Sequence, residues 1–232
     1  MDKKALAVAL ALTTIGSAAY CSVASAPPWA TISIEDTDLF WREASGPNGE
    51  QDAAALPLFR AVFAHDKEAV TTLLENGVSP NAVLYPKAWS PLMVAVAYHD
   101  VEMVDLLLKR DANINYVSKD PADYTALGVA ISATLDEGIR SGKDEPLLDY
   151  SMFNHLLDAG ADVNLDFGYD NDIAKWAATL GQMELVNRVL ARGYDRDLTG
   201  LNEILHVRRV DKKTEPEKQK AIKTIESLLR NR

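Results

Sequence analysis

One pattern of apolar and small residues occurs twice in this chain, 34 residues apart. Residues 56–81, LPLFRAVFAHDKEAVTTLLENGVSPN, align with residues 90–115, SPLMVAVAYHDVEMVDLLLKRDANIN. The aligned identities include Leu58 with Leu92, Ala61 with Ala95, Glu68 with Glu102 and Asn81 with Asn115. Self-similarity at such a period is typical of stacked repeat arrays, in which each unit packs only against its neighbours.

Each unit is predicted to contain two short helices. Apolar residues fall at helical spacing on one face of each helix. In the first unit they are Leu58, Ala61 and Val62, then Ala69, Val70, Leu73 and Leu74. Pro57 and Pro91 are expected in the first turn of a helix, where a missing N–H costs nothing. Helices of two to three turns are marginal alone in water, so their stability must come from neighbouring units.

The turns of these units are predicted to contain residues in the left-handed backbone conformation, with positive φ. Gly77 and Gly160 are expected to end the second helices, with Asp111 in the same place in the second unit. His65 and His99 recur between the two helices, where histidine tolerates this conformation. Stacked histidines could also attract a metal, but no cysteine or dense carboxylate cluster completes a site. We therefore predict no metal and no cofactor.

These units resemble the ankyrin repeat, which has about 33 residues and a T-P-L-H-x-A signature. The signature is matched by LPLFRA at 56–61, SPLMVA at 90–95 and TALGVA at 125–130, and the third copy ends in HLLDAGADVN at 155–164. A weaker fourth copy covers 172–195, and a fifth pair of segments, 201–207 and 221–229, would form a cap. The resemblance implies an all-α, ankyrin-type helical repeat solenoid with about four repeats plus terminal caps.

Residues 1–26 are predicted to be a secretory signal peptide. Lys3 and Lys4 precede an apolar run at 5–15 and then small residues, and the run is short for a membrane span. Cleavage after residue 19, 25 or 26 is possible, and an uncleaved anchor is the alternative. Lipidation of Cys21, the only cysteine, is disfavoured by Tyr20 before it. The leader indicates a periplasmic protein.

Residues 27–54 form an acidic extension with a net charge of −5. We expect a short helix at 37–44 that lays Phe40 or Trp41 over the first repeat as a cap. The alternative is an acidic arm that docks on a basic partner.

The repeat domain is predicted at 55–232. Its repeats are expected at about 55–88, 89–123, 124–170 and 171–198, with a C-terminal cap at 199–232. The third repeat is 14 residues longer between its helices than the first two, which places an insertion at about 134–146. Insertions in repeat proteins map to loops on one face. A solvated loop and a contact element both remain open for this one.

The charge of the chain limits its partners. The net charge is −10, and it would be −11 after export, which argues against nucleic acid and favours a neutral or basic partner. Residues 208–232 alone carry +5, and their closing helix has an apolar face made of Ala221, Ile222, Ile225, Leu228 and Leu229. The basic outer face of this helix is expected to be the polar cap that a solenoid end requires.

Sequence motifs for catalysis are missing. The chain has no Gly-rich phosphate loop, no G-x-S-x-G and no H-E-x-x-H. The acidic pairs at 136–137 and 144–145 have no defined acid/base partner. The chain is therefore not expected to be an enzyme.

The resemblance implies that a partner contacts the turn tips and the exposed side of the first helices. Aromatic residues are enriched at interface hot spots. The predicted partner-binding residues are Phe63, Tyr85, Trp89, Tyr98, Tyr116, Tyr124, Phe167 and Tyr169. The alternative is that several of these rings only pack against the turn of the neighbouring repeat.

The predicted function is a non-enzymatic, exported protein-binding module. It would hold one protein partner and be a monomer when unbound. An immunity or inhibitor role against a secreted effector or toxin is favoured by analogy, from the predicted fold and the predicted periplasmic location. A periplasmic scaffold or a chaperone-like partner is the alternative.

Overall fold

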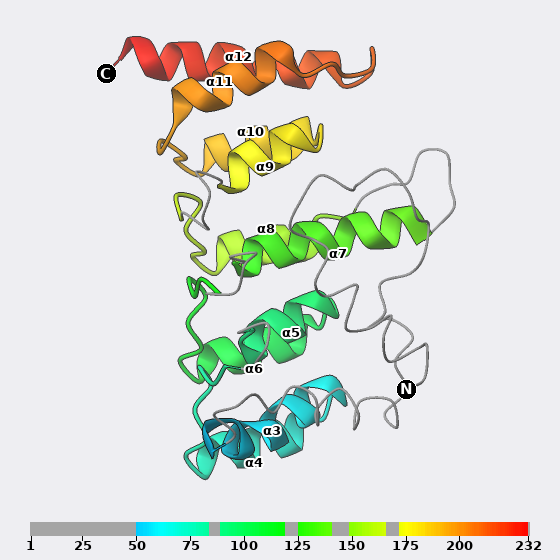
Figure 1. Ribbon diagram of the computed structural model, residues 1–232, viewed down its shortest axis with the longest axis vertical. Helices are drawn as coiled ribbons and strands as arrows, with labels where there is room; N and C mark the ends of the chain where they lie inside the picture. The colour runs from blue at the N-terminus through cyan, green and yellow to red at the C-terminus, as the bar shows by residue number, and fades with distance from the viewer. Residues whose placement is uncertain (1–49, 84–88, 119–124, 141–148, 166–171, 232) are drawn as a thin grey trace. The chain divides into compact units, whose positions relative to one another are not determined.

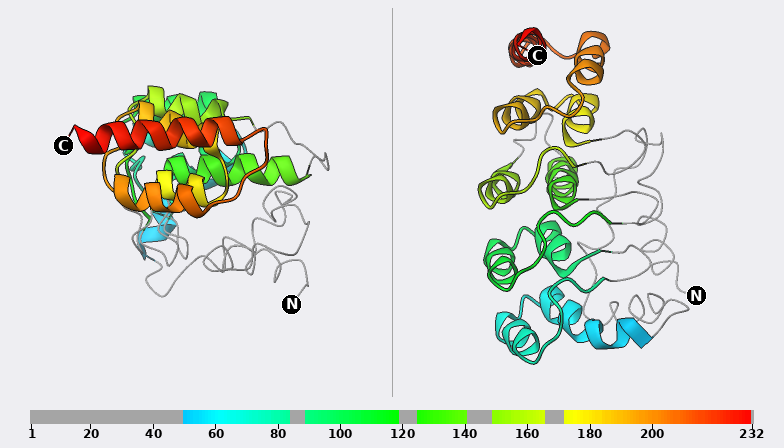
Figure 2. Two further views of the ribbon diagram at one scale, coloured as in Figure 1. Left: turned by 90° about the horizontal axis from the view of Figure 1, so that it is seen from above. Right: turned by 90° about the vertical axis from the view of Figure 1, so that its left-hand side faces the viewer.

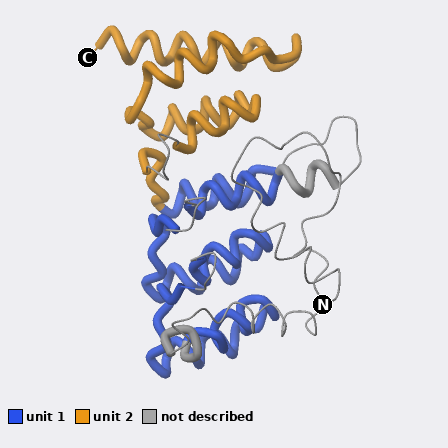
Figure 3. The backbone as a smooth tube through the Cα atoms, in the orientation of Figure 1, with its two compact units in different colours: residues 1–159 blue, residues 160–232 orange. Residues whose placement is uncertain are grey.

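The computed structural model describes residues 50–83, 89–118, 125–140, 149–165 and 172–231. Two compact units are distinguished, residues 1–159 and 160–232 (Figure 3). The described residues form ten helices and no strand, so the expected all-α repeat fold is confirmed. The predicted signal peptide and most of the acidic extension lie outside the described residues. No helix in the described part of the chain is long and apolar enough to cross a membrane.

The first unit consists of three helix pairs. They are α3 (Glu50–Phe63) with α4 (Lys67–Glu75), α5 (Pro91–Ala97) with α6 (Val101–Lys109), and α7 (Ala126–Arg140) with α8 (Ser151–Asp158). The first helices α3, α5 and α7 pack side by side in one layer, and the second helices lie in a second layer (Figures 1 and 2). All seven residues of α5 are buried, because neighbouring helices pack on it from three sides.

The second unit consists of two helix pairs. They are α9 (Ile173–Thr179) with α10 (Met183–Ala191), and α11 (Leu198–Val207) with α12 (Glu215–Arg230). The weak fourth copy is thus a helix pair, as is the predicted cap. On α12, Ala221, Ile222 and Ile225 are buried as expected, but Leu228 is 37% exposed. The last turn of α12 therefore contributes less to the core than its sequence pattern predicts.

Short polar side chains start most of the helices. Asp66 and Asp100 accept hydrogen bonds from backbone N–H groups in the first turns of α4 and α6, at 2.8 and 3.0 Å. Ser90 does the same for α5, and Pro91 occupies its first turn as predicted. The prediction for Pro57 was wrong, because α3 begins at Glu50 and contains this proline in its interior. The preceding residues 50–55, EQDAAA, are mostly good helix formers and extend the helix backward.

The left-handed turns occur where the sequence predicted them. His65, His99 and Asp111 have φ values of 55°, 54° and 64°, and Gly77 and Gly160 also have positive φ. A residue with positive φ ends a helix within one position and lets the chain reverse. The turns at His65 and His99 therefore bring a second helix back against the first, and the turns at Gly77, Asp111 and Gly160 lead the chain out of a second helix.

Asparagine side chains join successive repeats by the same pair of hydrogen bonds. In the first unit of the structure, Asn81 donates to the Asp111 carbonyl (3.0 Å) and accepts from the Asn113 N–H (2.7 Å). In the second, Asn164 donates to the Gly193 carbonyl and accepts from the Asp195 N–H. Each asparagine satisfies backbone groups that no helix uses, which fixes the register between neighbours.

The fourth repeat contains a buried polar network in place of the T-P-L signature. Asp172, Lys175 and Tyr194 are 0%, 6% and 1% exposed. The Tyr194 hydroxyl donates to Asp172 (2.8 Å), and the Lys175 ammonium lies 3.1 Å from the Asp197 carboxylate and 3.8 Å from that of Asp172. Burial, followed by the hydrogen bond to Asp172, raises the pKa of Tyr194 well above its usual value. The buried charges are therefore paired with each other.

The insertion in the third repeat begins as helix. The prediction of a loop from residue 134 was wrong for 134–140, which continue α7 to Arg140. Successive backbone bonds extend an existing helix at low cost, because its nucleus is already formed. The Thr134 hydroxyl donates to the Asp149 carbonyl (2.9 Å), which ties α7 to the segment that leads into α8. Residues 141–146 of the insertion lie outside the described residues.

Candidate protein-binding site

Two of the predicted partner-binding residues meet at the ends of neighbouring first helices. Phe63 is the last residue of α3, and Tyr98 directly follows α5. Their ring centroids are 5.3 Å apart with an interplanar angle of 74°, an edge-to-face arrangement. The offset of 34 aligns Phe63 with Ala97 and Tyr98 with Ala64. The two rings therefore come from non-equivalent positions of the two repeats.

A histidine and a carboxylate extend this pair. The His65 ring lies 5.5 Å from the Tyr98 ring, nearly perpendicular to it. The His65 Nδ1 is 2.6 Å from one Asp100 carboxylate oxygen, while the other oxygen accepts the N–H of Met103 at the start of α6. Phe63, His65, Tyr98 and Asp100 are called the aromatic cluster below. The sequence predicted a turn at His65 and no role for Asp100. The signal that could have found Asp100 is its spacing of 35 residues from His65, which places it in the equivalent turn of the next repeat.

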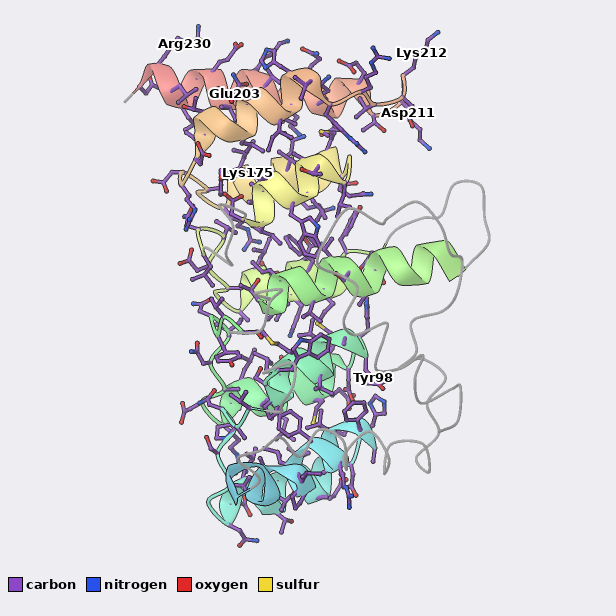
Figure 4. All side chains as sticks on the ribbon, viewed as in Figure 1. Tyr98, Lys175, Glu203, Asp211, Lys212 and Arg230 are labelled. Carbon is purple, nitrogen blue, oxygen red and sulfur yellow. The ribbon has the colours of Figure 1, made fainter. Side chains whose placement is uncertain are left out.

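The side chains of the aromatic cluster differ in how far they are exposed. Phe63 and Tyr98 are half-buried, whereas the His65 side chain is 49% exposed and that of Asp100 is 17% exposed. Burial raises the pKa of Tyr98 to about 12, so its phenol is neutral at physiological pH. Figure 4 labels Tyr98 at the end of α5. The cluster can therefore offer ring faces, a phenol hydroxyl and an imidazole to another molecule.

A family model for ankyrin repeats, in three copies, matches residues 57–141. Residues 57–141 carry ankyrin repeats. A search of curated proteins found no match. Ankyrin repeats form protein–protein interaction modules and are typically not enzymes, which agrees with the predicted class of function. The matched region includes the whole aromatic cluster.

Trp89 and Tyr116 are the other predicted binding residues that the structure describes. Trp89 directly precedes Ser90, which caps the start of α5, whereas Tyr98 follows the end of that helix. A seven-residue helix is about 10 Å long, so these two side chains belong to opposite ends of one repeat. Tyr116 is half-buried in the turn after α6. Tyr85, Tyr124, Phe167 and Tyr169 lie outside the described residues. Of the eight predicted residues, the structure brings Phe63 and Tyr98 together.

The outer side of these ankyrin repeats has a different character. Residues of α6 and of the turn after it line a shallow hollow of about 610 Å³, which includes Asp105, Leu108, Lys109, Ile114 and Ala159. Asp105 is also bound to His155 of α8, at 2.8 Å. Ligand pockets are usually enclosed and mainly apolar, unlike this open hollow with charged walls. Among the described side chains, no group of three or more could hold a metal ion.

Proposed function

We propose that this protein is exported to the periplasm, where it binds and neutralises a secreted effector or toxin through the aromatic cluster. The observation that carries the proposal is the edge-to-face pair of Phe63 and Tyr98, because it joins two ankyrin repeats in one half-exposed surface. The basic and apolar leader at residues 1–26 supports export.

The cluster has the properties of an interface hot spot. Aromatic side chains bury a large area on binding while immobilising few rotatable bonds. Asp100 is held by the backbone of α6 and in turn holds His65, which packs against the Tyr98 ring. Such a surface is ordered before the partner arrives, which lowers the entropic cost of association.

The first test is capture of partners from the envelope fraction of the source organism with residues 27–232 as bait. The expected result is one stoichiometric, toxin-like or hydrolytic protein whose activity is blocked when the two are mixed. Several unrelated envelope proteins, or a partner whose activity is unchanged, would refute neutralisation and favour a scaffold.

The second test locates the contact. Phe63→Ala with Tyr98→Ala should weaken binding of the captured partner by about 2 kcal/mol or more, roughly 30-fold, if the pair is a hot spot. Val207→Ala is the matched control, because Val207 is 81% exposed and lies in the second unit. An affinity equal to wild type in the double variant, with normal circular dichroism, would exclude the cluster as the contact.

A further inference from the structure

We propose that the last helix pair docks on anionic phospholipid headgroups through exposed cations of α12 and of the turn before it. These cations are called the basic face below, and they are Arg208, Arg209, Lys212, Lys213, Lys220, Lys223 and Arg230. The sequence suggested only a polar cap for this end of the chain. The proposal is independent of the function proposed above, because it uses neither the aromatic cluster nor the effector.

Helix α12 carries its cations on the side opposite its core contacts. The residues of α12 that are buried in the contact with α10 and α11 are Lys218, Ala221, Ile222 and Ile225. Positions 220, 223, 227 and 230 follow one another at spacings of three and four residues, which places them on one face of a helix. That face therefore contains Lys220, Lys223 and Arg230 with Ser227, and all four residues are exposed.

Carboxylates on α12 and in the turn before it only partly offset this charge. Glu217 accepts a hydrogen bond from the Asn187 amide (2.8 Å) and lies 3.7 Å from the Lys220 ammonium. Among the charged residues that are exposed in 207–231, seven are cations and two are anions. The basic face therefore keeps a net positive charge.

The turn between α11 and α12 is held in place from both sides. Asp211 accepts the backbone N–H of Thr214 (2.7 Å), and this bond lowers the pKa of the aspartate. The buried Lys218 ammonium donates to the Arg208 carbonyl (2.7 Å). The Arg208 guanidinium lies close to Gly181, where an added Cβ would be 3.2 Å from its Nη2. The cations of the turn are therefore presented on a supported backbone.

The distribution of these charges favours a lipid surface over a protein or a nucleic acid. Lys220 and Arg230 are ten positions apart, which is about 15 Å along α12. Figure 4 labels Lys212 and Arg230 at opposite ends of the last helix pair. Residues 207–231 contain no aromatic residue, whereas protein hot spots and single-stranded nucleic-acid sites commonly use aromatic side chains. Clusters of about four to eight Lys or Arg are typical of surfaces that bind anionic lipids.

An exposed apolar side chain adjoins the basic face. Val207 directly precedes Arg208 and is 81% exposed, the highest value among the large apolar side chains of the described residues. At a membrane surface, an apolar side chain beside cations can enter the boundary between headgroups and acyl chains. Val207 therefore suits a lipid surface better than a purely polar partner.

The test is cosedimentation of residues 27–232, which include every described residue, with lipid vesicles. The vesicles contain phosphatidylcholine alone or with about 30% phosphatidylglycerol, in about 0.1 M salt. Binding should require phosphatidylglycerol and should disappear in about 0.5 M salt, because salt screens exposed charges. Each Lys or Arg near an anionic surface strengthens binding about fivefold, so K220Q/K223Q/R230Q should lower the partition coefficient about 100-fold. Val207→Ser should lower it about threefold or more.

Two control variants separate loss of the basic face from other effects. R60Q/K109Q/R192Q removes three exposed cations that lie outside the basic face, and it should bind as wild type does. K220R/K223R/R230K keeps the charge of α12 and should retain binding. Circular dichroism of all variants should equal that of wild type.

Three results would overturn the proposal. The first is equal binding to vesicles of phosphatidylcholine alone, or no binding to phosphatidylglycerol at about 20 mM salt. The second is wild-type affinity in K220Q/K223Q/R230Q. The third is retention on immobilised polyglutamate or single-stranded DNA without binding to vesicles, which would assign the basic face to an acidic macromolecule instead.

Discussion

The buried network of the fourth repeat provides a direct test of how this unit is held together. Tyr194→Phe removes one hydroxyl from a side chain that is 1% exposed and leaves its ring in place. The hydroxyl donates to the buried Asp172 carboxylate (2.8 Å) and accepts the Asp197 N–H (3.3 Å). Loss of a hydrogen bond to a charged group costs about 1.5–3 kcal/mol. We therefore expect unfolding of residues 160–232 to become easier by about 2–3 kcal/mol.

The assay is hydrogen exchange of peptides from α9 and α10, together with urea unfolding of residues 27–232. A double-mutant cycle with Asp172→Asn isolates the contact, and a coupling free energy of about 1 kcal/mol or more is expected between the two positions. A Tyr194→Phe variant within about 0.5 kcal/mol of wild type would refute the reasoning, because that is the range of ordinary surface substitutions.

Three further predictions concern caps, turns and acid stability. Asp100→Ala should lower the free energy of unfolding, measured in urea titrations, by more than Asp66→Ala. Both variants remove an N-cap worth about 1 kcal/mol, but only Asp100 also contacts His65. Equal losses would show that the His65 contact contributes nothing to stability. Gly181→Ala should reduce thermal stability more than Gly77→Ala. Both glycines have positive φ (81° and 88°), but only at Gly181 would the new Cβ lie 3.2 Å from the Arg208 guanidinium. Arg208→Ala should remove the difference. The pKa of Asp197 is lowered by the hydrogen bond from the Gly200 N–H and then by Lys175, so its contribution to stability is present above about pH 4 and is lost as pH falls through the lowered pKa. Asp197→Asn should therefore make the unfolding free energy less dependent on pH below about pH 4, and an unchanged slope would contradict this.

The features that sequence reasoning predicted correctly are local or periodic. Helix pairs follow from apolar residues at helical spacing, and the positive φ values of His65, His99 and Asp111 follow from their place between helices. The repeat offset also placed Phe63 and Tyr98 on neighbouring first helices. Each of these predictions depends on a few consecutive residues, or on a pattern that the chain repeats.

The start of the first helix and the form of the insertion could not be predicted in this way. Pro57 suggested a helix start, yet the preceding residues 50–55 extend α3 backward around it. Residues 134–140 suggested a loop by their length and polarity, yet they continue α7. In both cases the pattern is compatible with either structure, and an already formed helix decides the outcome by extending at low cost.

The sequence by itself determined the class of this protein. Its pattern repeats after 34 residues, its predicted helices are too short to be stable alone, and its turn residues recur at fixed places. Together these features permit little other than a stacked helical array. Only the tertiary structure decided which side chains far apart in the sequence meet. Three such contacts join residues 22 to 35 positions apart: His65 with Asp100, Tyr194 with Asp172, and the Arg208 guanidinium with Gly181. Such contacts depend on the rotation and stagger between stacked helices, which arise from packing in three dimensions and leave no periodic signal in the sequence.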